Sequence, residues 1–208
     1  MGVSPSIQAF LDELEKMPKV PMDMIPAAMY RERANELMKF EGEVQEVKHV
    51  EDRTLPLEGR DIPVRVYTPT KGEAPYPCLV YYHGGGWVIG NLDSHDSVCR
   101  LLAEESECVV ISVDYRLAPE HKFPAAVEDA YDSLVWIAEH PKEFQIDVNR
   151  IAVGGDSAGG NLSAVTSIIA KEKGGPKLVH QFLIYPATGY KGDLPKSMVE
   201  NGEGYFLT

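Results

Sequence analysis

The stretch that decides the fold spans residues 151–160 and reads IAVGGDSAGG. It joins residues 150–153, which are apolar after Arg150 and which we expect to form a strand, to a segment at residues 158–173 that we expect to form a helix. Ser157 lies between them, with Gly155 and Gly159 two positions away on either side. A serine in so tight a strand-to-helix turn is strained and exposed at a helix N-terminus, where the helix dipole favours developing negative charge. The pattern predicts a nucleophilic serine, and the alternative is a glycine-rich turn whose serine only caps the helix.

A second glycine-rich segment, residues 83–87, reads HGGGW and directly follows the apolar run at residues 78–82. Loops of this type supply backbone N–H donors to the oxyanion that forms during ester hydrolysis. Successive glycines allow the backbone to approach a substrate closely and to turn its N–H groups toward one point. Because both segments follow a strand and occur in the expected order, they favour the nucleophile over the helix-cap alternative.

Strands and helices alternate around these two segments. We expect further strands at residues 108–113 and 179–185, and helices at residues 96–105 and 125–140. This alternation predicts an α/β fold with a mainly parallel sheet and helices on both faces. Before it, valines at positions 44, 47 and 50 and the alternating run at 62–66 predict a hairpin that turns at residues 58–61. The first 40 residues predict two short helices, the second at residues 27–40, separated by prolines.

Composition excludes several classes of function. The chain has 208 residues and a formal net charge of −12, so it repels phosphate backbones and anionic lipid surfaces. We therefore expect no nucleic-acid partner and no stable membrane anchoring. The cysteines Cys78, Cys99 and Cys108 are odd in number and lack CxxC spacing, which predicts neither a metal site nor a disulfide framework. Free thiols and the lack of a signal-peptide pattern favour a cytoplasmic location.

The motifs together resemble those of bacterial carboxylesterases of the hormone-sensitive-lipase family, especially its thermophilic members. The resemblance extends over essentially the whole chain and rests on YHGGGW at 82–87, DYRLAPE at 114–120, FPAA at 123–126 and GDSAGG at 155–160. It implies an α/β-hydrolase fold, hydrolysis of short- to medium-chain acyl esters, and no metal or cofactor. The small acyl ester would then be the partner of the protein.

The resemblance also implies roles for individual residues. Ser157 would be the nucleophile, the N–H groups of Gly85, Gly86 and Ala158 would form the oxyanion hole, and His83 and Gly84 would order the loop. By the same resemblance, residues 1–42 form a helical cap segment, residues 43–190 form the hydrolase core, and residues 191–208 begin a second cap segment.

Other polar residues near these motifs are expected to have structural roles. Asp114, Tyr115, Arg116 and Glu120 would shape the core beneath the site, because ion-pair networks also place charges near clefts. His95 and His121 are expected to be solvated or satisfied by local contacts.

The remaining triad residues have no counterpart in the sequence. On this fold the order along the chain is serine, then aspartate or glutamate, then histidine. The histidine that follows Ser157 is His180, which opens the predicted strand after the nucleophile's helix and so breaks that order. We therefore expect the chain to be an incomplete core that lacks the C-terminal strands. Such a chain is expected to be inactive alone, and to self-associate or to require a complementing C-terminal portion. A non-catalytic, receptor-like binding protein on the same fold is the alternative.

Overall fold

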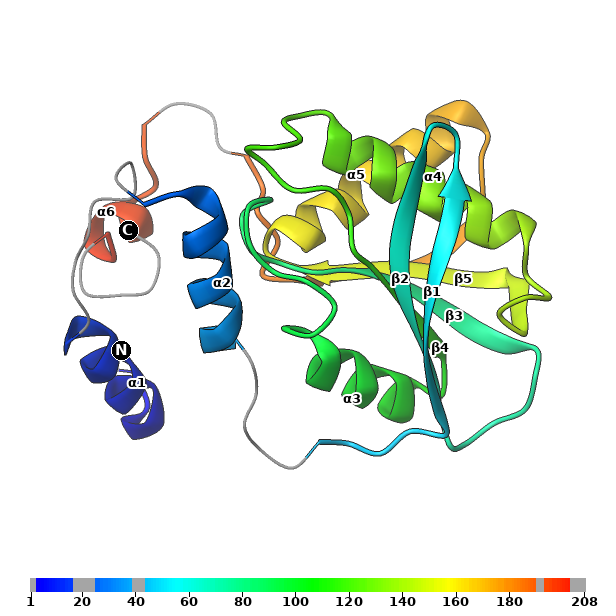
Figure 1. Cartoon of the computed structure of the whole chain (residues 1–208), viewed down its shortest axis with the longest axis horizontal. Coiled ribbons are helices and arrows are strands. Elements are labelled where there is room, and N and C mark those ends of the chain that lie inside the picture. Colours follow the sequence, from blue (N-terminus) through cyan, green and yellow to red (C-terminus); the bar gives the residue numbers. More distant parts are fainter. Residues whose placement is uncertain (1–2, 17–24, 39–43, 190–192, 203–208) are drawn as a thin grey trace. The chain divides into compact units, whose positions relative to one another are not determined.

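The computed structural model describes residues 3–16, 25–38, 44–189 and 193–202. They divide into two compact units, Ala27–Ala187 and a smaller one formed by Met1–Pro26 with Thr188–Thr208. In the smaller unit the helices are α1 (Pro5–Lys16) and α6 (Lys196–Glu200). The larger unit, which carries all the candidate site residues, begins with α2 (Ala27–Met38) and is shown with its elements labelled in Figure 1.

The elements of the larger unit alternate in type after an initial pair of strands. They are β1 (His49–Leu57), β2 (Arg60–Thr68), β3 (Tyr76–Tyr82), α3 (Asp96–Ser106), β4 (Val109–Val113), α4 (Ala125–Glu139), β5 (Ile146–Asp156), α5 (Ala158–Lys173) and β6 (Leu178–Ile184). The predicted helices at 96–105, 125–140 and 158–173 are confirmed to within one residue at either end.

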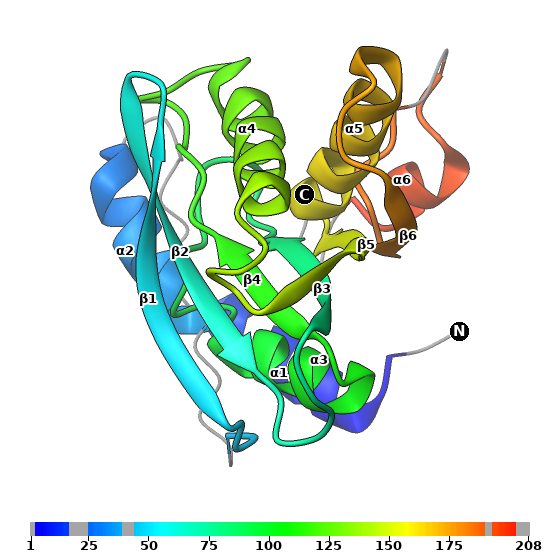
Figure 2. The same ribbon diagram turned by 90° about the vertical axis from the view of Figure 1, so that its right-hand side faces the viewer.

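The strands form one six-stranded sheet in the order β1-β2-β4-β3-β5-β6. β1 pairs with β2, and β2 with β4, in antiparallel fashion, whereas β4, β3, β5 and β6 run parallel. In Figure 2, α4 and α5 lie on one face of the sheet and α3 lies on the other. The predicted α/β fold with a mainly parallel sheet and helices on both faces is therefore confirmed.

Two hydrophobic layers hold the helices to the sheet. Successive side chains of a strand point to opposite faces, and β3 follows this rule. Val80 and Tyr82 join the layer under α4 and α5, and Leu79 and Tyr81 join the layer under α3. Because both faces are covered, β3 is apolar throughout and its carboxyl end, where the glycine loop begins, is fixed in the centre of the sheet.

The hairpin differs from the prediction in the position of its first strand. β1 occupies His49–Leu57, so the valines at 44 and 47 lie outside it, and the turn is reduced to Glu58 and Gly59. β1 is one of the two edge strands, and most of its side chains are exposed or half-buried. Because many residues of β1 are charged, the strand lacks the alternation of apolar and polar residues from which a strand is predicted. Gly59 adopts φ 73°, the left-handed conformation that a two-residue turn requires.

Candidate active site

Ser157 occupies the turn between β5 and α5 in a strained backbone conformation. Its φ of 51° and ψ of −113° lie outside the regions that residues with a side chain normally adopt. The N–H of Ser157 donates to the carbonyl of Ile184 at 3.0 Å, and its carbonyl accepts from the N–H of Ala187 at 2.9 Å. The side chain makes no capping hydrogen bond to α5. The helix-cap alternative is therefore wrong, and the strain is maintained by backbone contacts.

The glycines on either side of Ser157 allow β3 to pack directly against this turn. A β-carbon on Gly155 or on Gly159 would clash with the carbonyl oxygen of Tyr82, the last residue of β3. The requirement for glycine at both positions therefore comes from the neighbouring strand. Because β3 packs so closely against this turn, the HGGGW loop, which follows Tyr82 directly, begins immediately beside the serine.

The loop itself is a tight turn built on glycine. Gly85 and Gly86 have φ values of 118° and 60°, which disfavour residues with a β-carbon. The carbonyl of Gly85 accepts hydrogen bonds from the N–H groups of Val88 and Ile89 at 3.1 and 2.9 Å. A β-carbon on Gly85 would also collide with the backbone of Ile89, whereas one on Gly86 would meet open space.

The carboxylate of Asp156 joins the loop to the serine turn. The N–H of Gly84 donates to Asp156 Oδ1 at 2.8 Å, and a β-carbon on Gly84 would clash with the same carboxylate. Because Asp156 directly precedes Ser157 in the chain, this contact fixes the loop relative to the serine. Nothing in the sequence pattern indicates this role of Asp156, which lies within the GDSAGG motif.

Backbone N–H groups of the glycine loop and of the start of α5 have no hydrogen-bond acceptor among the residues that the structure describes. Within the described part of the chain, the N–H groups of Gly85, Gly86 and Ala158 donate to no protein acceptor. Gly85 is half-buried and Gly86 exposed, and the first N–H groups of an α-helix have no intrahelical acceptor, so all three donors are free to bind an oxygen of a ligand. Two of them belong to the glycine loop and one to the first residue of α5, and they are suited to an oxygen that carries negative charge.

His83 packs beneath the loop as a neutral ring. It is fully buried, its Nδ1–H donates to the carbonyl of Gly84 at 2.7 Å, and it stacks on Tyr115 with ring centroids 4.4 Å apart. Burial, together with the neighbouring His95 ring, lowers the pKa of His83 to about 4. The neutral ring therefore forms no ion pair with Asp114, whose Oδ1 lies 3.9 Å from His83 Nε2.

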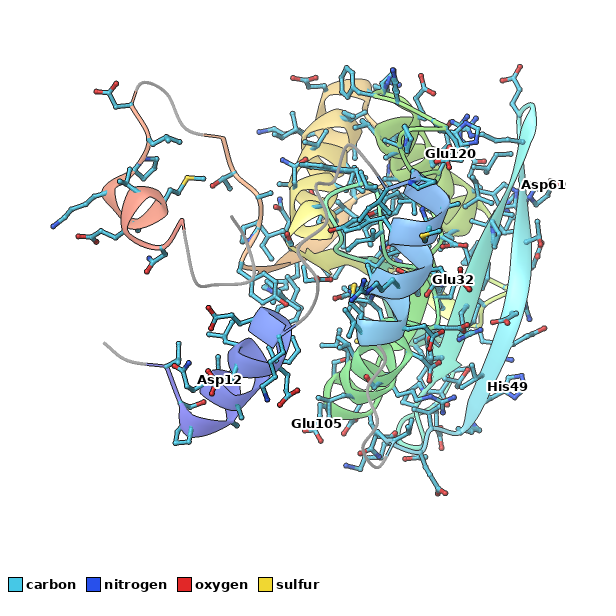
Figure 3. All side chains as sticks on the ribbon, turned by 60° about the vertical axis from the view of Figure 1, so that its left-hand side comes forward. Asp12, Glu32, His49, Asp61, Glu105 and Glu120 are labelled. Atoms are coloured by element: carbon cyan, nitrogen blue, oxygen red, sulfur yellow. The ribbon has the colours of Figure 1, made fainter. Side chains whose placement is uncertain are left out.

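The segment after β4 braces the loop from below, as expected. The hydroxyl of Tyr115 donates to the carbonyl of His83 at 2.7 Å. Arg116 pairs with the buried Asp129 at 2.8 Å, and Glu120 pairs with Arg31 of α2 at 2.7 Å. Figure 3 shows Glu120 beside α2. These charges are engaged in structural contacts.

His95 is not solvated, and its contacts are only partly local, because Nδ1 lies 2.9 Å from Ser94 Oγ whereas Nε2 reaches a distant residue. Only 5% of its surface is exposed, and its Nε2 lies 3.3 Å from Asp156 Oδ1. Asp156 is distant in the sequence, so no local pattern could reveal the contact. Burial disfavours the ionised Asp156, but hydrogen bonds from His95, Tyr81 and the Gly84 N–H outweigh burial and lower the Asp156 pKa. His121, by contrast, is exposed.

An apolar cavity of about 640 Å³ opens beside the loop and the first turns of α5. Its lining includes Gly86 of the loop and Asn161 of α5, and Trp87, Phe123 and Ile169 are among its apolar walls. Among the described residues, no group of three or more acidic, histidine or cysteine side chains could hold a metal ion. No helix in the described ranges is long and apolar enough to cross a membrane.

Comparisons with known proteins agree with this geometry. A family model described as alpha/beta hydrolase fold matches residues 79–208. Carboxylesterase NlhH of Mycobacterium tuberculosis is 50% identical over 159 residues, which cover 76% of this chain and 50% of that protein. The arylesterase of Saccharolobus solfataricus is 36% identical over 207 residues, which cover 100% of this chain and 67% of the relative.

Solved structures give the same result. A hyperthermophilic esterase from the archaeon Pyrobaculum calidifontis superposes with a TM-score of 0.89 at 44% sequence identity, covering 100% of this chain and 67% of its own. The chain spans about half the length of the first curated relatives that it matches. The chain therefore belongs to the α/β-hydrolase family, and its resemblance to carboxylesterases of the hormone-sensitive-lipase type is confirmed.

Proposed function

We propose that the protein is a serine carboxylesterase that hydrolyses short- to medium-chain acyl esters, with Ser157 as its nucleophile. One observation carries this proposal: the strained turn of Ser157, whose hydroxyl does not cap α5, lies beside three backbone N–H groups that have no acceptor among the described residues. Acyl transfer requires a nucleophile and donors for the oxyanion, and this turn supplies candidates for both.

The chemistry proposed at this site has two steps. Ser157 Oγ attacks the ester carbonyl carbon while a histidine base takes its proton, and the carbonyl oxygen becomes an oxyanion. The N–H groups of Gly85, Gly86 and Ala158 stabilise that oxyanion as oxyanion-hole donors. Collapse of the intermediate expels the alcohol, which receives the proton from the histidine. Water, activated by the same base, then attacks the acyl-enzyme and releases the carboxylic acid and free serine.

The acid and the base of this Ser-Asp-His mechanism are proposed to lie outside residues 1–208. None of the histidines of the described residues hydrogen-bonds to Ser157, and His83 and His95 are already engaged in the loop's support. His180 lies on the exposed strand β6. The receptor-like, non-catalytic alternative has no observation in its favour, since the similar proteins are named as esterases.

The substrate range follows from the cavity beside the loop. An apolar space of about 640 Å³ bordered by Gly86 suits an uncharged acyl or alcohol chain of several carbons better than a charged ligand. His83 and Gly84 are proposed to order the loop, because the first supports it from below and the second binds Asp156.

We also propose an organisation and partners for the chain. Residues 1–42 and 191–208 are proposed to belong to a cap, and residues 43–190 to the core. The five central residues of β6 are exposed at the edge of the sheet, which supports self-association or pairing with a complementing C-terminal portion. The buried free thiols of Cys78 and Cys99 support a cytoplasmic location.

The test is hydrolysis of p-nitrophenyl butyrate by the complete protein and by its Ser157→Ala variant. We expect metal-independent turnover in the parent and a loss of at least about four orders of magnitude in kcat in the variant. Turnover that survives Ser157→Ala but is lost with a chelator would contradict the proposal.

A further inference from the structure

We propose that His95 is a positioning residue: its imidazole holds the carboxylate of Asp156, which fixes the glycine loop at residues 83–86 against the turn of Ser157. The inference rests on the proposed function, because it assigns a residue that sets the geometry of the proposed oxyanion donors. His95 lies between the loop and α3, outside all the motifs that identified the site.

One carboxylate oxygen carries the connection. Asp156 Oδ1 accepts from the Gly84 N–H at 2.8 Å and from the Tyr81 hydroxyl at 2.8 Å, and His95 Nε2 lies 3.3 Å from it. Tyr81 is fully buried and His95 almost so. A carboxylate withdrawn from water needs such donors to remain ionised, and the direction of this oxygen decides where the Gly84 N–H points.

The protonation of the His95 ring follows from its two contacts. The ionised carboxylate can only accept a hydrogen bond, so Nε2 must carry a proton. Nδ1 lies 2.9 Å from Ser94 Oγ, which can either donate or accept. The Nε2–H of His95 therefore supplies the donor to Asp156.

The backbone of His95 is itself held in place from the sheet. Arg65 of β2 contacts Asp93 at 2.9 Å and Asp96 at 3.3 Å, on the two sides of His95. The hydroxyl of Tyr67, also on β2, donates to Asp96 at 2.9 Å. The His95 ring therefore extends from a segment that is anchored to β2. Through its contact with Asp156, it fixes the glycine loop relative to that segment.

This arrangement has a specific kinetic consequence. Oxyanion donors act mainly in the transition state, so a small displacement of the loop lowers kcat more than it changes KM. Displacements of about 1 Å in a catalytic constellation cost up to about 100-fold. A residue that only stabilised the fold would change the free energy of unfolding without this selective loss of kcat.

The experiment compares two polar replacements in the complete protein. The amide nitrogen of glutamine in His95→Gln can reach the position of Nε2, whereas that of asparagine in His95→Asn reaches only the position of Nδ1. We expect His95→Asn to lower kcat by about 10- to 100-fold with KM within about threefold, and His95→Gln to retain kcat within about fivefold. His49→Ala is the control, because His49 lies on the outer face of β1 with its side chain exposed (Figure 3), and it should leave both constants unchanged.

Hydrogen exchange of the amides at residues 84–86 supplies a readout without turnover. Exchange at Gly84 should be about 10-fold faster in His95→Asn than in the parent, and close to the parent in His95→Gln. The proposal would be overturned if His95→Asn kept the exchange rates and the kcat of the parent. It would also be overturned if His95→Asn and His95→Gln lost kcat and protection from exchange equally. A parent protein that binds no ester and turns none over would contradict the proposed function instead, and the exchange rates would still decide the role of His95.

Discussion

Replacement of Asp129 by alanine is expected to destabilise the protein strongly. Asp129 lies on α4, is fully buried, and receives hydrogen bonds from two arginines. Arg60 Nε donates to its Oδ1 at 2.6 Å, and the Nε and backbone N–H of Arg116 donate to its Oδ2 at 2.8 and 2.9 Å. The carboxylate thus links α4 to β2 and to the segment that supports the glycine loop.

The magnitude follows from what the substitution leaves behind. Removing one partner of a buried ion pair costs about 3–5 kcal/mol, because the remaining charge is buried without compensation. The side chains of Arg60 and Arg116 are 18% and 28% exposed, so water can partly solvate them. We therefore expect Asp129→Ala to lower the free energy of unfolding by about 3 kcal/mol, the lower end of that range.

Urea unfolding measures this loss, and Asp132→Ala is the matched control. Asp132 also lies on α4 and also pairs with Arg60, at 2.5 Å, but its side chain is 44% exposed. An exposed ion pair contributes at most about 1 kcal/mol. Equal losses in the two variants, or a loss below about 1 kcal/mol for Asp129→Ala at an unchanged slope with urea, would refute the reasoning.

Two further predictions concern the loop and its support. Gly85→Val should lower kcat for butyrate esters by about 100- to 1000-fold with a smaller change in KM, because a β-carbon collides with Ile89; a kcat near that of the parent would locate the oxyanion donors elsewhere. Burial, reinforced by the charge of Asp93, raises the pKa of Asp114 from 3.8 to about 6. The protonated carboxyl therefore stabilises the folded state at low pH, and this contribution is lost as the pH rises through about 6. The free energy of unfolding of Asp114→Asn, relative to that of the parent, should therefore increase by about 1–2 kcal/mol between about pH 4 and pH 8, after allowance for the partial exposure of Asp114. Urea unfolding at both pH values measures this change, and a difference between the two proteins that stays the same at both would contradict the prediction.

The sequence predicted the part of the site that depends on local chain conformation. The elbow of Ser157 and the turn at Gly85 and Gly86 require glycine at fixed spacings, and glycine spacing is visible in a sequence. The parallel core was predictable for a similar reason, because strands buried on both faces are apolar throughout.

Contacts between distant segments were not predictable in this way. His95, directly before α3, and Asp156, at the end of β5, meet only in the folded chain. Similarly, β5 begins at Ile146 rather than at Arg150, because its first residue pairs with Tyr76 across the sheet. Residues 148–150 are exposed, so this part of β5 has no apolar pattern to predict it. Edge and rim positions are determined by the partner strand, which the local sequence does not contain.

Covalent labelling tests the role of Ser157 most directly. The complete protein is treated with a p-nitrophenyl alkylphosphonate, digested, and analysed by mass spectrometry. Attack by Ser157 Oγ on phosphorus would release p-nitrophenolate and leave one phosphonyl group on the peptide that contains residues 155–160. We expect one equivalent of label at Ser157, loss of esterase activity in proportion to labelling, and no label in Ser157→Ala. Full inactivation with the phosphonyl group on another residue would contradict the assignment of the nucleophile.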